Sequence, residues 1–311
     1  MMGRVTNLVF MVLLSLCSNV PCTHADNVYV STASLNTVLE INSNGSQSTF
    51  ATSASGLAYP TGVALDGSGN LYVANASANT IEKFNPGGAG TVFASSGLSL
   101  PWGMAFDSSG NLYVANLAGD TIEEFDPTGS GAVFATAAEG LNFPAAIAFD
   151  ASGNLYVANV GNYTIEKFSP GGTGSAFATT ASGISNPEGL AWFGGNLYVA
   201  NYGNNTIEKF NALGQGSIFS STNLLRFPDG LAFDSNGNLY VANEGNGDIL
   251  KFNQDGVGSV FASGLANAVG IAIEEIPEPS ALLLLGLGLS VLAFSHRAAL
   301  PYPRSRHRRR R

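Results

Sequence analysis

Two acidic residues stand at matching places in the sequence, Glu188 in "PEGLAW" and Asp229 in "FPDGLAFD". Each follows a proline and precedes a glycine, so a repeated backbone unit would place the two carboxylates side by side. Such a pair can bind Ca²⁺ weakly, with backbone carbonyl oxygens and water, or share one proton. Solvated carboxylates at the rim of the fold remain the simplest interpretation.

The composition excludes several other kinds of chemistry. Residues 26–276 contain no cysteine and no histidine, because Cys17, Cys22, His24, His296 and His307 all lie outside this range. Disulfides, Cys/His zinc sites, Ser-His-Asp triads and Cys-His pairs are therefore excluded from the central part of the chain.

The central part is also strongly acidic. Residues 26–276 hold 21 Asp and Glu against five Lys and Arg, a net charge of −16. Such a surface repels phosphate backbones, so nucleic acid is not expected as a partner.

A repeat must position the two carboxylates. The heptad "GNLYVAN" occurs five times, at intervals of 41, 43, 42 and 42 residues. Each unit contains four short apolar runs, such as "GMAF", "NLYVA", "TIEEF" and "AVFA", separated by Gly- and Asp-rich turns. Both faces of the "NLYVA" run are apolar, which indicates a strand covered on both sides, as in a propeller blade.

The ends of the repeat give the number of blades. "NVYVST" at 27–32 is a sixth, divergent copy that lacks its innermost strand, and "VGIAIE" at 269–274 is one strand with nothing after it. The sequence predicts an all-β, six-bladed β-propeller of four-stranded antiparallel blades over residues 26–276. The C-terminal strand is expected to close the ring by pairing with the N-terminal blade.

The unit "PTGVALDGSGNLYVANASANTIEKF" resembles NHL repeats, and "YVSTASLNTVLEIN" resembles the YVTN type of surface propeller. More distantly, the segments around Glu188 and Asp229 resemble strands of the gluconolactonase and senescence-marker propellers, whose carboxylates and Asn residues hold a divalent cation. That resemblance implies Glu188 and Asp229 as metal ligands. Trp102, Ala145 and Val269 stand at the equivalent positions and supply no ligand side chain.

Binding residues are expected where the repeats differ. The "DxxGN" and "NPGG"-like turns are repetitive, so we assign their face to scaffolding. The entries to the blades and the loops after "VAN" vary, and their common face is called the variable face below. The candidate ligand-binding residues there are Trp102, Tyr163, Glu188, Tyr202, Asn204 and Asp229. Phe143 and Phe227 also fall on or near this face, and of its aromatic residues these two are the ones expected to be buried between blades; contact with a ligand is the alternative.

Several recurring polar residues have structural explanations. The last Asn of each heptad, such as Asn75, is expected to cap its own loop, and Asp66 and its copies are expected to form Asx turns. The lysines of the third strands, Lys83, Lys167, Lys209 and Lys251, are interpreted with Glu82, Glu166 and Glu208 as a solvated outer face. In the fourth full copy "AWFGGN" lacks the turn Asp and predicts a Gly-Gly hairpin.

The two ends predict export. Residues 1–25 have the charge, apolar run and small residues of a signal peptide that signal peptidase would cleave; a lipoprotein signal ending at Cys17 is the alternative. Residues 277–311 combine Pro277, Glu278 and Pro279, an apolar run at 281–295 and an Arg-rich tail. This order resembles the PEP-CTERM signal that exosortase processes, with 281–295 as a transient membrane span; a permanent inner-membrane anchor is the alternative.

Three functions are compatible with these patterns. The first is an exported surface or extracellular-matrix protein that binds a polysaccharide or a surface protein without catalysis, so no catalytic residue is assigned. The second is a metal-dependent lactonase around Glu188 and Asp229, and the third is a matrix component that serves display alone. No cofactor is expected, apart from weakly bound Ca²⁺ or another divalent cation.

Overall fold

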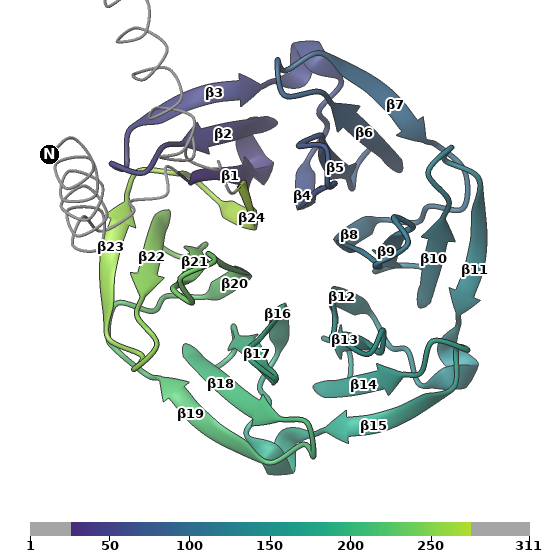
Figure 1. Cartoon of the computed structure of the whole chain (residues 1–311), viewed down its shortest axis with the longest axis vertical. Helices are drawn as coiled ribbons and strands as arrows, with labels where there is room; N and C mark the ends of the chain where they lie inside the picture. Colours follow the sequence, from purple (N-terminus) through teal and green to yellow (C-terminus); the bar gives the residue numbers. More distant parts are fainter. Residues whose placement is uncertain (1–25, 275–311) are drawn as a thin grey trace, which may run out of the picture. The chain divides into compact units, whose positions relative to one another are not determined.

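The computed structural model describes residues 26–274, which form six four-stranded antiparallel sheets arranged in a ring (Figure 1). The predicted all-β, six-bladed propeller is confirmed. The strands of each blade are given from the axis outward. Blade 1 consists of β24 (Ala268–Glu274), β1 (Asn27–Thr32), β2 (Thr37–Ile41) and β3 (Gln47–Ala51); blade 2 of β4 (Pro60–Leu65), β5 (Leu71–Asn75), β6 (Thr80–Phe84) and β7 (Gly90–Ala94); and blade 3 of β8 (Pro101–Phe106), β9 (Leu112–Asn116), β10 (Thr121–Phe125) and β11 (Gly131–Ala135). Blade 4 consists of β12 (Pro144–Phe149), β13 (Leu155–Asn159), β14 (Thr164–Phe168) and β15 (Gly174–Ala178); blade 5 of β16 (Pro187–Phe193), β17 (Asn196–Asn201), β18 (Thr206–Asn211) and β19 (Gly216–Ser220); and blade 6 of β20 (Pro228–Phe233), β21 (Leu239–Asn243), β22 (Asp248–Phe252) and β23 (Gly258–Ala262). Four single-turn 3₁₀ helices lie in connections: η1 (Ala33–Leu35), η2 (Ser53–Ser55), η3 (Ala137–Glu139) and η4 (Thr180–Ser182).

The ring closes as predicted. β24 pairs antiparallel with β1, with Val28 opposite Ile273 and Val30 opposite Ile271. The first blade therefore takes its innermost strand from the C-terminal end of the propeller. This pairing covers the edge of β1 and joins both ends of the unit into one sheet.

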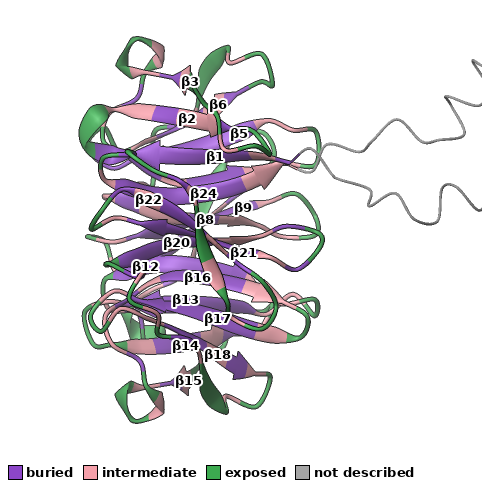
Figure 2. Cartoon of the chain, turned by 90° about the vertical axis from the view of Figure 1, so that its left-hand side faces the viewer, coloured by how far each residue is buried: buried purple, intermediate pink, exposed green. Residues whose placement is uncertain are grey.

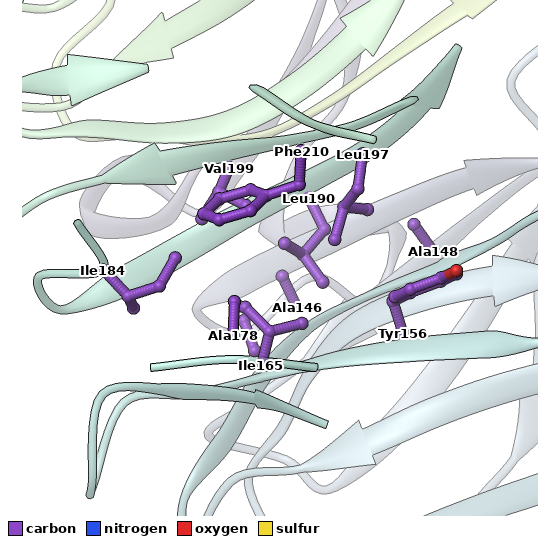
Figure 3. Close-up of a cluster of buried hydrophobic side chains, with 11 residues drawn as sticks. Ala146, Ala148, Tyr156, Ile165, Ala178, Ile184, Leu190, Leu197, Val199 and Phe210 are labelled. Atoms are coloured by element: carbon purple, nitrogen blue, oxygen red, sulfur yellow. The ribbon is translucent and has the colours of Figure 1, made fainter. Parts of the chain in front are cut away.

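The hydrophobic core lies between the blades. Every residue of β5, β9, β13 and β21 is buried, so these "LYVAN" strands are covered on both faces. Each of six buried clusters combines residues of two neighbouring blades. The cluster between blades 4 and 5, for example, packs Tyr156 and Ile165 with Leu197 and Phe210 (Figure 3). Exposed residues gather in the turns at the two faces of the disc (Figure 2).

Glycines allow the innermost strands to approach one another. A Cβ atom on Gly189 would lie 1.9 Å from the carbonyl oxygen of Asp229 on the next blade. Gly62, Gly103, Gly230 and Gly270 make the same approach, at 2.1 to 2.4 Å, to the carbonyl oxygens of Trp102, Ala145, Val269 and Thr61. The residue between Pro and Gly is therefore held against the preceding blade by its own backbone.

The recurring Asn residues join one blade to the next connection. The Asn75 side chain accepts a hydrogen bond from the Ala58 amide at 3.0 Å and donates to the carbonyl oxygen of Gly56 at 3.2 Å and to Thr80 Oγ1 at 3.1 Å. Asn116, Asn159 and Asn201 do the same in their blades. Asn243 accepts from the Arg226 amide and donates to the Leu224 carbonyl oxygen and to Asn246 Oδ1. Their role is structural, as predicted, but they hold the incoming inter-blade connection as well as their own loop.

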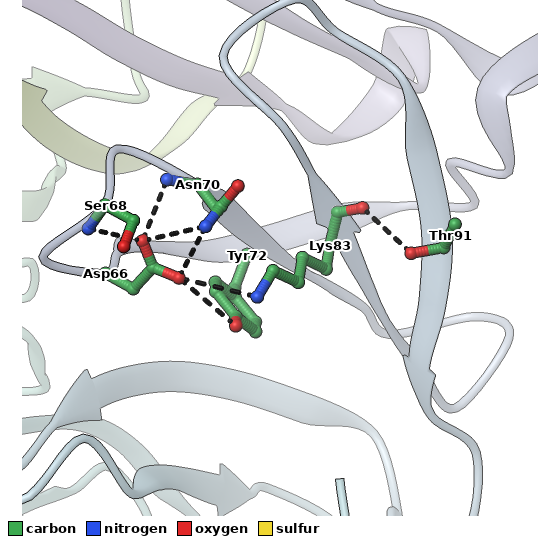
Figure 4. A network of polar contacts seen from close by, with 6 residues as sticks. All are labelled: Asp66, Ser68, Asn70, Tyr72, Lys83 and Thr91. Atoms are coloured by element: carbon green, nitrogen blue, oxygen red, sulfur yellow. Dashed lines mark hydrogen bonds and ion pairs between the residues drawn. The ribbon is translucent and has the colours of Figure 1, made fainter. Parts of the chain in front are cut away.

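Asp66 forms the predicted Asx turn. Its Oδ1 accepts hydrogen bonds from the amides of Ser68 and Asn70, both at 2.9 Å (Figure 4). Lys83 reaches back from β6, with its Nζ 3.5 Å from Asp66 Oδ2 and 4.9 Å from the centre of the Tyr72 ring. The lysine thus covers a tyrosine while it pairs with the turn.

The prediction that the third-strand glutamates lie on a solvated outer face is wrong. Glu82, Glu166 and Glu208, with Glu123 of blade 3, are only 6–8% exposed. The first three directly precede lysines, and Glu123 holds the same position in blade 3. Because alternate residues of a strand point to opposite sides, the glutamates face the neighbouring connection. Burial raises the pKa of all four carboxyls.

The predicted Gly-Gly hairpin is present between β16 and β17. Gly194 and Gly195 have φ of +57° and +80°, and they join Phe193 directly to its cross-strand partner Asn196. Two consecutive positive φ angles are the requirement of a type I′ turn, and glycine meets it without strain.

The predictions for both ends fall outside the described residues. The signal peptide at 1–25, the apolar run at 281–295 and the motif at 277–279 are not part of residues 26–274. Among residues 26–274 no helix has the length and apolar character needed to cross a membrane.

Gly189→Ala tests the close approach of the inner strands. The new methyl group meets the Asp229 carbonyl oxygen, so we expect a loss of about 1–3 kcal/mol in the free energy of unfolding. Gly67→Ala is the matched control, since a Cβ there meets no atom within 4 Å. Denaturant unfolding of both variants measures the difference; equal stabilities would contradict the packing described.

Candidate functional site

The site is built from two positions in each blade. The first is the residue between Pro and Gly at the start of the inner strand, and the second directly follows the Asn that ends the next strand. Cross-strand register brings them to one end of the blade, because Pro187 lies opposite Asn201 and Pro228 opposite Asn243. Glu188 and Tyr202 occupy the two positions in blade 5.

In blade 6 the same two positions hold Asp229 and Glu244. Burial and the charge of Glu244 raise the pKa of Glu188 to about 7. Burial, followed by the charges of Glu188 and Glu244, raises the pKa of Asp229 well above its ordinary value. The three residues therefore interact electrostatically, and we call them the acidic cluster.

Neutral donors contact two members of the acidic cluster. Asn186 Nδ2 donates to Glu188 Oε1 at 3.3 Å, and Asn267 Nδ2 donates to Glu244 Oε1. Asp229 is 5% exposed, and within residues 26–274 its carboxylate accepts no hydrogen bond. A buried carboxylate without a donor favours its protonated form or a bound cation.

Glu244 was not among the residues predicted for the site. It directly follows the heptad of blade 6, where Tyr202 stands in blade 5 and Val160 in blade 4. The antiparallel register of the first two strands could have identified it, since the residue after each heptad must lie beside the Pro-x-Gly entry of the same blade.

Tyr202 lies beside the acidic cluster. Burial, the charge of Glu244 and a hydrogen bond with Glu244 raise the pKa of the Tyr202 hydroxyl to about 12. Its ring stacks on Phe227, with centroids 4.7 Å apart and planes 24° apart. The cluster therefore has an aromatic edge formed by blades 5 and 6.

The other predicted binding residues lie apart from this edge. Trp102 is partly buried against Tyr59, with centroids 6.5 Å apart, and its Nε1 has no hydrogen-bond partner in the described part of the chain. Tyr163 is 44% exposed. Asn204 is exposed, and its Oδ1 accepts a hydrogen bond from Thr206 Oγ1 at 2.7 Å within its own loop.

The expectation that Phe143 and Phe227 pack between blades is wrong, because they are 50% and 45% exposed. Each precedes the proline of an inner strand and has a φ near +50°, which turns its side chain outward. Each amide donates at 2.6 Å to a side chain of the preceding blade, to Asp120 Oδ1 and to Asn205 Oδ1 respectively. These inter-blade bonds hold a backbone conformation that is costly for aromatic residues.

A metal role for Glu188 and Asp229 stays a prediction. Across residues 26–274, no three His, Cys, Asp or Glu side chains are arranged so that they could hold a metal ion.

Comparison with family models identifies two segments. Residues 225–252 match the NHL repeat, and residues 275–298 match the PEP-CTERM protein-sorting motif. The chain thus carries an NHL repeat within a six-bladed propeller and a motif that implies export, surface sorting and processing by exosortase. No curated protein matches the sequence significantly.

Solved propellers share the fold. Virginiamycin B lyase from Staphylococcus aureus has 16% sequence identity and a TM-score of 0.63, over 80% of this chain and 88% of the lyase. Its catalytically inactive histidine-to-alanine variant with quinupristin has 15% identity and a TM-score of 0.62, over 82% and 93%. A chain of a nidogen–laminin complex has 19% identity and a TM-score of 0.69, over 80% and 98%. At these identities the likeness shows the fold alone.

The raised pKa values predict how stability depends on pH. Between pH 4.5 and about 7 the folded protein binds a proton at Glu188 that the unfolded chain does not, so stability falls as pH rises through this window. We expect the Glu188→Gln/Asp229→Asn variant to be more stable than the wild type at pH 8, by on the order of 1–3 kcal/mol, and to approach it at pH 5. Denaturant unfolding at both pH values tests this.

Asp255→Asn is the control, because Asp255 is exposed and lies in a turn of blade 6. If the Glu188→Gln/Asp229→Asn variant differed from the wild type by the same free energy of unfolding at pH 5 and at pH 8, the carboxyls of the acidic cluster would not titrate as described.

Proposed function

We propose that this NHL-repeat propeller is an exported surface protein that binds a polysaccharide or another surface protein through its variable face, without catalysis. The PEP-CTERM motif at 275–298 supports surface sorting. The exposed aromatic residues of the variable face support the binding of such a partner.

The exposed aromatic residues of the variable face carry the proposal. Tyr59, Phe143, Tyr163 and Phe227 are 38–50% exposed, and all four have positive φ angles of +49° to +58°. Three of them precede inner strands in blades 2, 4 and 6. Rigid aromatic side chains provide contact area at a small cost in conformational entropy, and they stack on sugar rings or fill pockets of a protein partner.

Lyase chemistry has no support in the residues of this chain. The staphylococcal virginiamycin B lyase is catalytically inactive when one histidine is replaced by alanine, whereas residues 26–276 of this chain contain no histidine. One chain of the nidogen–laminin complex shares the fold, so a propeller of this kind occurs in a protein–protein complex.

Replacement of aromatic residues tests the binding face. We expect the Phe143→Ser/Phe227→Ser variant to bind purified surface polysaccharides, or surface proteins extracted from the same cells, at least about tenfold more weakly than the wild type. Val92→Ser/Val260→Ser is the control, since both valines are about half exposed on the outer strands β7 and β23. Equal losses in both variants would contradict a binding site on the variable face.

A metal-dependent hydrolase is the second candidate, and one observation favours it. A carboxyl with a pKa of about 7, as at Glu188, can act as a general acid or base near neutral pH. The hydrolase would also need a divalent cation, which Glu188 and Asp229 would hold together with backbone carbonyl oxygens and water.

Thermal unfolding with Ca²⁺, Mg²⁺ or Zn²⁺ distinguishes this candidate from the first. A bound cation stabilises the folded state by about 2.7 kcal/mol at a concentration 100 times its Kd. The hydrolase requires a cation-specific rise in Tm that is absent from the Glu188→Ala/Asp229→Ala variant. No rise with any of the three cations would exclude it and leave the binding protein.

A further inference from the structure

Two cavities formed by the described residues lie on the face assigned to scaffolding. One, of about 420 Å³, lies between blades 3 and 4 and is lined by the Asp107 turn, Tyr113, Glu124, Phe134 and Phe149. The other, of about 410 Å³, lies between blades 1 and 2 and is lined by Glu274 and the Asp66 turn. Both adjoin blades in which the repeat departs from its own pattern.

In blades 2, 4 and 6 the lysine of the third strand lies between a carboxylate and a tyrosine ring. In blade 2, Lys83 Nζ lies 3.5 Å from Asp66 and 4.9 Å from the centre of the Tyr72 ring (Figure 4). In blade 4, Lys167 lies 3.7 Å from Asp150 and 5.0 Å from the Tyr156 ring.

Blade 6 repeats this geometry, with Lys251 at 3.4 Å from Asp234 and 4.6 Å from the Tyr240 ring. Three blades of one chain therefore show where an ammonium group binds between this Asp and this Tyr. They serve as the comparison for blade 3.

Blade 3 keeps the Asp and the Tyr but exchanges the lysine for Glu124. Tyr113 lies directly opposite Glu124, as Tyr72 lies opposite Lys83. The position that holds a positive charge in blades 2, 4 and 6 holds a second negative charge here, next to the cavity.

The carboxylates of Asp107 and Glu124 accept hydrogen bonds from uncharged donors only, among the described residues. Asn111 Nδ2 donates to Asp107 Oδ2 at 3.1 Å and to Glu124 Oε1 at 3.0 Å. Burial and the charge of Glu124, which also hydrogen-bonds the phenol, raise the pKa of the Tyr113 hydroxyl, so this group stays protonated. No base among residues 26–274 pairs with Asp107 or Glu124.

The cavity also has aromatic walls. The Tyr113 ring packs edge-on against Phe134 and Phe149, with centroid distances of 5.1 and 4.9 Å. Carboxylates beside aromatic rings favour an organic cation over a metal ion, because the rings attract the ammonium charge and bury its alkyl chain.

We propose that the cavity between blades 3 and 4 binds an alkylammonium group, such as a lysine side chain of another polypeptide, between Asp107, Tyr113 and Glu124. The ligand takes the place that the lysines of blades 2, 4 and 6 fill from within the chain. This site lies on the face opposite the proposed binding surface, so it stands independently of the proposed function.

Titration of the full-length protein with Nα-acetyl-lysine N-methylamide, followed by calorimetry, tests the proposal. The norleucine analogue, which has the same chain length and no ammonium group, should bind at least about tenfold more weakly. Glucosamine, titrated in parallel, distinguishes amino sugars from lysine side chains as the source of the ammonium group. Failure of both amines to bind, or equal binding of norleucine, would overturn the proposal.

Glu124→Lys is the decisive variant, because it rebuilds the arrangement of blades 2, 4 and 6 and should fold at least as stably as the wild type. It should abolish binding, and Glu124→Gln should weaken it by about tenfold. Glu40→Lys, at the equivalent position of blade 1, is the matched control and should leave the blade 3 site unchanged. Undiminished binding in both Glu124 variants would place the ligand elsewhere.

Discussion

The close approach of the six inner strands is the constraint on which the rest of the propeller depends. Five glycines place backbone carbonyl oxygens of the next blade where a side chain would otherwise start. Blade 4 has Ala146 at this position, so the contact between β12 and β16 accommodates one methyl group. The close contact between neighbouring inner strands fixes the position of the residue before each glycine. It therefore determines which side chains lie near the axis of the propeller.

The chemical character of the variable face follows from that geometry. Two neighbouring blades contribute carboxylates at the fixed positions, whereas the others contribute Val269, Thr61, Trp102 and Ala145. Charge is therefore concentrated on one side of the axis, and burial raises the pKa of Glu188 and Asp229. The amides of Tyr59, Phe143 and Phe227 donate hydrogen bonds to side chains of the preceding blades. The same contacts that join the blades therefore also fix the proposed binding surface.

The repeat made the fold predictable from the sequence. The exposure of individual side chains was not predictable, because it depends on the direction in which each side chain points. A heptad with two apolar faces and an unpaired last strand determine the blade, the number of blades and the ring closure. The pairing of Glu188 with Asp229 follows from their equal places in the repeat. The exposure of Phe143 and Phe227 depends instead on a positive φ before proline, which sequence patterns do not reveal for aromatic residues. The burial of Glu82 and its copies depends on which side of β6 faces the next connection. Comparison of the blades, rather than their consensus, identifies Glu124 and Glu244.

Hydroxyl-radical footprinting of the protein on intact cells and after purification tests the central claim, that the variable face engages the cell surface. We expect Tyr59, Phe143 and Phe227 to be protected on cells, while Val92 and Val260 of the outer strands are oxidised equally in both states. Equal oxidation of all five side chains would contradict it, because the exposed aromatic residues would then contact nothing at the surface to which the protein is sorted.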